Sequence, residues 1–146
     1  MKLDPIFTVK ENKLYKIADG SLVSTDSLKQ IQIPWSTVEM EDEIYNEEFL
    51  AVLRDQLKQM EAAGLFAVLV PLVDKPLSTE EQSEYFINAF NHAARRVKDC
   101  TSVAGFELPS ELKDKDGFIE KLAVKHAQYV YFSKAENLTD SSIVKY

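Results

Sequence analysis

The sequence predicts an α/β fold, because strand-like and helix-like segments alternate along it. Two apolar runs, within 29–35 and 65–73, are expected to be strands, and the continuous apolar character of the second is typical of a parallel strand covered on both faces. A helix over 46–64, capped by Asn46, is expected between them, and another after a Ser78–Glu81 capping box. Such alternation predicts a parallel sheet with right-handed crossovers.

The flanking segments extend this pattern at both ends. Residues 1–28 are expected to hold a short β-hairpin, because apolar and polar residues alternate there and Asp19-Gly20 is typical of tight turns. The stretch 101–112 is expected to be a third strand that ends in two carboxylates. A short helix capped by Asp116 and a strand at 128–132, which has strong strand propensity, should follow.

Two architectures fit the β/α units, which occupy residues 29–146. One is a partial TIM barrel, about half of one, with helices on one face of the sheet. The other is an open, flavodoxin-like three-layer sheet with helices on both faces. A full barrel needs eight units and about 250 residues, so the length favours half a barrel preceded by the hairpin. Residues 1–146 are expected to form a single domain.

Composition and charge narrow the classes of function. The net charge of −7 disfavours nucleic acid or an anionic membrane as a partner. Cys100 is the one cysteine, so neither an intramolecular disulfide nor a cysteine zinc site is expected. His92 and His126 fall in helical segments, and no metal or other cofactor is expected. The sequence lacks a secretory leader and an apolar run of membrane-spanning length, so a cytoplasmic location is expected.

Candidate site residues lie at the carboxyl ends of the expected strands, where ligands meet parallel sheets. Trp35 would either stack on a sugar or cap the core, and Asp74 would either bind a ligand hydroxyl or turn its loop. Glu107 is expected near the sheet, where a buried carboxylate needs partners and is a candidate proton donor. Glu111 is expected on the loop after Pro109. The alternative for both glutamates is a solvated pair.

A family resemblance rests on several of these segments. GFELPSEL, residues 105–112, resembles the strand-four signature of the clan of retaining β-glycosidases with TIM barrels, which includes cellulases and β-mannanases. The Asn-Glu-Pro triplet of that signature falls on Ser110-Glu111-Leu112. IQIPW, with Gln32 in place of the usual Arg, resembles the second barrel strand, and GLFAVLVPLVD resembles the third. The segment 7–23 resembles the part that precedes the barrel.

The resemblance implies that Glu111 is the general acid/base. The clan's nucleophile is a second Glu on strand seven, which this sequence lacks, so Asp74, Glu136 or a carboxylate of a second copy would have to replace it. We therefore expect a glycoside-hydrolase-like domain, reduced in length, that acts as a non-catalytic binding or assembly module and forms a homodimer. The residues expected to bind carbohydrate are Trp35, Asp74, Glu107 and Ser110. The alternative is a β-glycoside hydrolase that uses Glu111 together with a carboxylate from its dimer partner.

Overall fold

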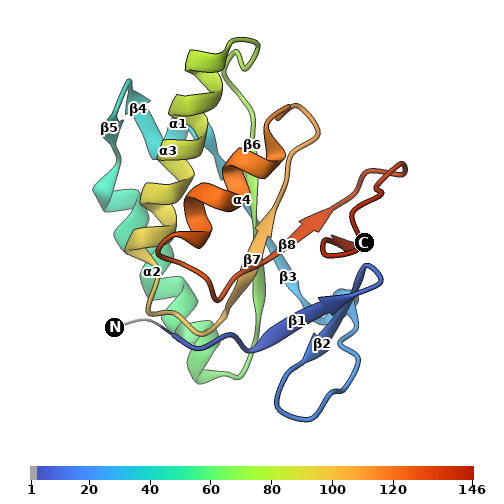
Figure 1. The fold of residues 1–146 in the computed structure, drawn as a ribbon. Coiled ribbons are helices and arrows are strands. Elements are labelled where there is room, and N and C mark those ends of the chain that lie inside the picture. Colours follow the sequence, from blue (N-terminus) through green and yellow to red (C-terminus); the bar gives the residue numbers. More distant parts are fainter. Residues whose placement is uncertain (1–2) are drawn as a thin grey trace.

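The computed structural model describes residues 3–146, and its centre is a five-stranded parallel sheet (Figure 1). The strands stand in the order β3-β6-β7-β8-β9. Their bounds are Lys29–Pro34 for β3, Ala67–Leu72 for β6, Val103–Glu107 for β7, Val130–Ser133 for β8 and Val144–Lys145 for β9. All four neighbouring pairs are parallel, as the alternation of elements predicts.

The helices cover one face of this sheet, as Figure 1 shows. They are α1 (Trp35–Val38), α2 (Glu47–Ala62), α3 (Glu80–Arg96) and α4 (Lys115–Ala123). Buried side chains of all four helices belong to one apolar cluster, in which Leu57, Phe90 and Phe118 pack with Leu69 and Phe106 of the sheet. Helices on one face confirm the half-barrel. The flavodoxin-like alternative, which needs helices on both faces, is wrong.

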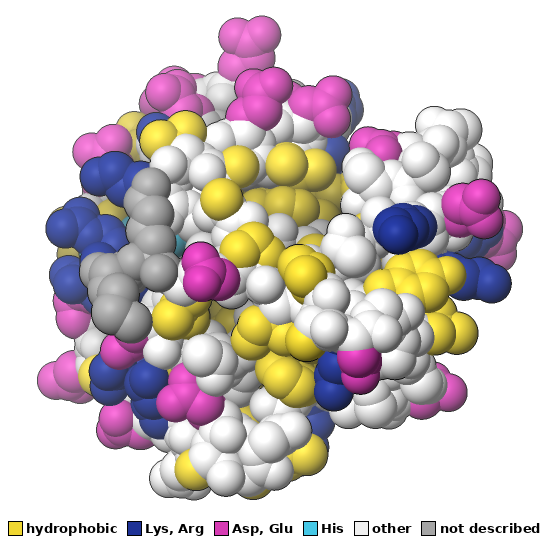
Figure 2. Space-filling view, turned by 60° about the horizontal axis from the view of Figure 1, so that its bottom comes forward, with side chains coloured by type: hydrophobic (Ala, Val, Ile, Leu, Met, Phe, Trp, Pro, Cys, Tyr) yellow, Lys and Arg dark blue, Asp and Glu magenta, His cyan; other side chains and the backbone are white. Residues whose placement is uncertain are grey.

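The N-terminal hairpin covers part of the opposite face of the sheet, at the lower end in the view of Figure 1. It consists of β1 (Phe7–Lys10) and β2 (Lys13–Lys16). Phe7 and Leu14 of the hairpin join Val68 and Phe132 of the sheet in a second apolar cluster. In Figure 2 the lower end of Figure 1 comes forward, and hydrophobic side chains reach the surface in the middle of this view with charged ones around them. The expected hairpin is confirmed, but its tight turn lies at Glu11–Asn12, whose φ angles are 50° and 64°.

Several shorter elements complete the described part of the chain. Asp19-Gly20 makes a second turn, after which Leu22 forms a bridge to Tyr15, and a 3-10 turn, Thr25–Ser27, leads into β3. After β3 and α1, the acidic residues 39–45 form a small hairpin of β4 (Glu39–Glu41) and β5 (Ile44–Tyr45). No helix within residues 3–146 has both the length and the apolar character that crossing a membrane would need.

The helix ends follow the sequence signals closely. Asn46 caps α2 by accepting a hydrogen bond from the Phe49 amide, and Gly64 follows the helix at φ 71°, a left-handed conformation that glycine adopts readily. The capping box of α3 is formed by Thr79 and Gln82, one residue beyond the expected pair. Residues 78–82, STEEQ, satisfy the capping-box pattern in both registers, which explains the difference. The cap of α4 is Asp114 rather than Asp116.

A bulge in β7 determines which of its side chains point to the face of the sheet opposite the helices. Val103 pairs with Ala67, but Gly105 pairs with the next residue, Val68, so one residue of β7 is extra. Phe106 points into the helix-side cluster. Since side chains alternate along a strand, Glu107 therefore points to the face opposite the helices.

Candidate functional site

A groove of about 520 Å³ lies at the carboxyl ends of β6, β7 and β8. Its walls are residues 70–73 at the end of β6, 107–111 at the end of β7, and the segment after β8, with Lys115 from the first turn of α4. In a parallel sheet this is the end at which ligands bind. The groove therefore brings together Glu107, Ser110 and Glu111, three of the residues proposed from the sequence.

Glu107 lies deepest among these three and is held by two other side chains. Its side chain is 13% exposed, the Tyr146 hydroxyl donates a hydrogen bond of 2.6 Å to Oε1, and the Lys134 Nζ lies 3.4 Å from the same oxygen. Lys134 also donates to the side-chain oxygen of Gln30, at 2.9 Å. Burial, followed by the contact with Glu107, raises the pKa of Tyr146, so its phenol remains protonated and donates at neutral pH.

Glu111 lies at the rim of the groove and is exposed, as is its neighbour Ser110. The Ser110 hydroxyl donates to Glu111 Oε1 at 3.2 Å. The next residue, Leu112, is fully buried in the helix-side core, and its amide donates to the Pro109 carbonyl. Where the clan signature has Pro, this chain thus uses a core leucine, which anchors the loop that carries Glu111.

Trp35 and Asp74, both expected to bind the sugar, are not among the residues that line the groove. Trp35 begins α1 and is 2% exposed, with its ring edge-to-face against Phe86 and its Nε1 donating to Glu39 at 2.8 Å. Its ring offers no face to a ligand, because it caps the core. The Asp74 carboxylate accepts hydrogen bonds from the amide and hydroxyl of Ser36, and so joins the end of β6 to α1.

Other polar side chains near the groove were given no role from the sequence. Lys134 follows β8 directly, and the sequence places it at a strand end without indicating a contact for it. Tyr146 and Gln30 gave no signal, because they reach Glu107 and Lys134 across 39 and 104 residues of sequence. Glu136, proposed as a replacement carboxylate, does not line the groove, although its carbonyl accepts from Lys145. Within residues 3–146, no three His, Cys, Asp or Glu side chains gather to form a metal site.

Comparisons with known proteins bear on the fold. No family model matches the sequence, and no curated protein matches it significantly. Endo-glycoceramidase II from Rhodococcus sp. matches in structure with a TM-score of 0.55 and 13% identity, over 91% of this chain and 48% of that one. GH5_18 from Bifidobacterium longum subsp. infantis matches with a TM-score of 0.55 and 10% identity, over 77% and 36%. The fold is therefore similar to about half of the TIM barrel in these structures.

A third match is consistent with this half-barrel. A family 39 glycoside hydrolase from the gut symbiont Bacteroides cellulosilyticus WH2 matches with a TM-score of 0.55 and 16% identity, over 73% of this chain and 26% of that one. The half-barrel spans less than half the length of each of these three structures. The likeness therefore establishes the fold, and the site has to be interpreted from its own residues.

Proposed function

We propose that this half-barrel is a non-catalytic module that binds carbohydrate in the groove at the carboxyl ends of its strands. The observation that carries the proposal is the mixed lining of the groove. Apolar residues at the end of β6 line the groove together with Glu107, Glu111, Ser110 and Asn137. Sugars present both apolar faces and hydroxyl groups, and such a lining suits both.

Hydrolysis by one chain is disfavoured by the state of the two carboxylates. Retaining hydrolysis needs two carboxyl groups about 5–5.5 Å apart, one to attack the anomeric carbon and one to protonate the leaving oxygen. Glu107 already accepts from Tyr146 and lies beside Lys134, which leaves it a poor nucleophile. Glu111 is exposed at the rim of the groove and is not held close to Glu107 by any contact between the two carboxylates that the structure shows.

Titration of the protein with cellobiose and with Manβ1-4GlcNAc, followed by NMR, tests the proposal. These sugars are chosen because structures with which the chain matches were solved with cellobiose-like inhibitors or with Manβ1-4GlcNAc. We expect saturable shifts at the amides of Ser110, Glu111 and Asn137, with a dissociation constant of about 1 mM, which is typical of weak binding. Glu111→Gln should weaken binding, whereas Glu136→Gln, an exposed carboxylate outside the groove lining, should not. Absence of shifts at saturating sugar would reject the proposal.

The exposed position of Glu111 favours one alternative, in which a second copy of the chain supplies a carboxylate to the groove. β3 is an edge strand of the sheet, and an edge strand pairs readily with another chain, so we propose a homodimer as well. A strict monomer at micromolar concentration in light scattering would count against the dimer. Release of the aryl group from an aryl β-glucoside or β-mannoside, abolished in Glu111→Gln, would replace the binding module with a hydrolase.

A further inference from the structure

The turn of the N-terminal hairpin holds the segment 140–146 in place by hydrogen bonds. The Asn12 side-chain amide donates to the carbonyl of Asp140 at 2.7 Å and to that of Ile143 at 2.8 Å. The Asn12 backbone adds a bond from its amide to Ser141, at 3.0 Å, and accepts one from Lys145, at 3.1 Å. Four hydrogen bonds therefore join one turn residue to a segment about 130 positions away in the sequence.

Tyr146, in this segment, contacts the Glu107 carboxylate of the proposed site. β9 pairs with β8, and the Tyr146 amide donates to the Ser133 carbonyl at 3.2 Å. The Tyr146 ring packs at 5.3 Å from the ring of Phe132, its hydroxyl reaches Glu107, and the Lys134 Nζ lies 5.4 Å from its ring centroid. A protonated phenol on a carboxylate makes the kind of hydrogen bond that a sugar hydroxyl would make.

We propose that residues 140–146 form a strap, pinned by Asn12, which keeps the Tyr146 hydroxyl on Glu107 as an internal substitute for a ligand hydroxyl. The strap closes the deep carboxylate and leaves the rim residues Ser110 and Glu111 open. A ligand that reaches Glu107 has to displace Tyr146. That the ligand is a carbohydrate rests on the proposed function. The contact between Tyr146 and Glu107 does not depend on the proposed function.

The size of the strap makes its opening feasible. β9 has two residues and pairs with one strand, so few hydrogen bonds hold it apart from those to Asn12. Short elements of this kind open locally at a smaller free-energy cost than the whole domain. Val144 and Ile143 are buried and oppose opening. Loss of the Asn12 side-chain bonds should therefore shift the equilibrium towards the open form without unfolding the sheet.

The matched variants are Asn12→Gly and Glu11→Gly. Both residues lie in the same turn with positive φ, which glycine tolerates, so each change removes a side chain without adding backbone strain. Of Glu11 and Asn12, the structure shows side-chain hydrogen bonds to the strap only from Asn12. A third variant, Tyr146→Phe, removes the hydroxyl and keeps the ring on Phe132.

Accessibility of Glu107 is measured by its coupling to glycine ethyl ester with a water-soluble carbodiimide, read by mass spectrometry. Modification of Glu111 in the same sample is the internal reference. We expect the Glu107 rate to rise about tenfold in Asn12→Gly, as the loss of two hydrogen bonds would give, and to rise in Tyr146→Phe. The Glu111 rate and all rates in Glu11→Gly should match the wild type. An unchanged Glu107 rate in both test variants would overturn the strap.

Sugar titration of the same proteins separates the strap from the proposed function. Tighter binding of cellobiose by Tyr146→Phe than by the wild type supports the strap as a barrier to the ligand. Equal binding by the two, with Glu107 more reactive in the variant, overturns that role. If no variant binds sugar while Glu107 becomes reactive in Asn12→Gly, the labelling supports the strap and the carbohydrate proposal fails.

Discussion

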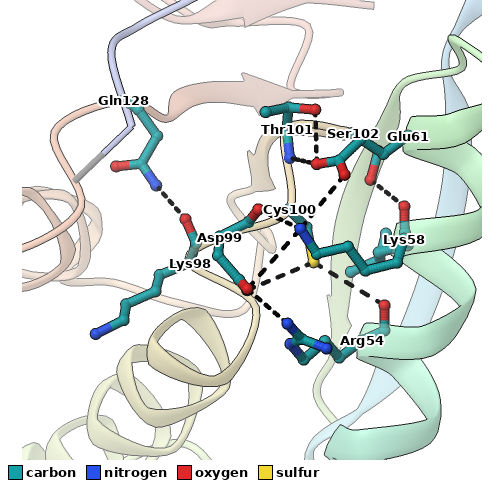
Figure 3. Close-up of polar contacts among 10 residues, drawn as sticks. Arg54, Lys58, Glu61, Lys98, Asp99, Cys100, Thr101, Ser102 and Gln128 are labelled. Carbon is teal, nitrogen blue, oxygen red and sulfur yellow. Dashed lines mark hydrogen bonds and ion pairs between the residues drawn. The ribbon is translucent and has the colours of Figure 1, made fainter. Parts of the chain in front are cut away.

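The two ends of the parallel sheet use polar side chains differently. At the amino end, Arg54 and Lys58 of α2 bind Asp99, and Glu61 binds Thr101, so that the loop between α3 and β7 is tied to a helix (Figure 3). At the carboxyl end, Glu111 contacts its own neighbour in sequence and is exposed in the groove. These polar groups at the amino end hold the fold together, whereas Ser110 and Glu111 at the carboxyl end are accessible to a ligand.

Glu61 illustrates what the amino end requires. It stands in the last turn of α2, where the helix dipole disfavours a carboxylate. Its oxygens accept from the Thr101 amide at 2.7 Å and the Thr101 hydroxyl at 2.8 Å, and Lys58 lies 3.3 Å away. The bond from the Thr101 amide is the main cause that lowers the pKa of Glu61. The Glu61 carboxylate, although disfavoured by the dipole of α2, is therefore held there by its contact with Thr101.

The largest expected effect comes from Gly105, which lies in β7 between the two ends. A Cβ at this position would stand 1.6 Å from the Val130 carbonyl oxygen, so β7 and β8 could not stay paired. Gly105→Ala should lower the free energy of unfolding by more than about 3 kcal/mol and disturb both ends at once. Urea denaturation followed by circular dichroism measures this.

Gly117→Ala is the matched control. There the added Cβ meets the side chain of Asp114, which can rotate away at the expense of its cap on α4. The expected loss is about 1 kcal/mol, the usual value for a lost N-cap. Equal losses in the two variants would contradict the close pairing of β7 with β8.

A direct comparison of the two ends uses one glutamate from each. Glu61→Ala should lower the free energy of unfolding by about 2 kcal/mol, because it removes two hydrogen bonds to a charged group from a partly buried contact. Glu111→Ala should change it by less than about 0.5 kcal/mol, as surface substitutions usually do. A large loss of stability in Glu111→Ala would show that the rim, too, holds the fold together.

The sequence predicted most of the fold because the signals that set it are local. The Asn46 cap, the stop at Gly64 and the apolar run of β6 each depend on a few neighbouring residues, and all three were found. The register of the α3 cap was missed by one residue, since Thr79 competes with Ser78 for the same role. Short-range patterns of this kind leave small ambiguities that only tertiary contacts resolve.

The site was harder to predict because its contacts are long-range. Trp35 follows a strand, which suggested a ligand contact, but the short helix α1 turns its ring into the core beside Glu39. The partners of Glu107 include Tyr146, and no sequence pattern joins the two. The sequence therefore located the groove through Glu107 and Glu111 but could not indicate which side chains close it.

The last predicted effect depends on pH and concerns Cys100, which lies among the polar contacts of the amino end. Burial, followed by the nearby Asp99 carboxylate, raises the pKa of Cys100 from 9.0 to about 11. The unfolded chain then loses this proton at a lower pH than the folded chain does. Stability that depends on the neutral thiol is therefore fully present below pH 9 and is lost as the pH rises towards 11.

Between pH 8 and pH 10 this linkage should lower the free energy of unfolding by about 1 kcal/mol, in addition to any contribution from tyrosines. Cys100→Ala removes the thiol, so the variant should lose about 1 kcal/mol less than the wild type over this range. The comparison of pH slopes is insensitive to the cavity that alanine leaves, because that loss is the same at every pH. Parallel slopes would mean that folding does not shift the pKa of the thiol, as expected for a thiol that solvent reaches. The contrast between the two ends would then not extend to Cys100.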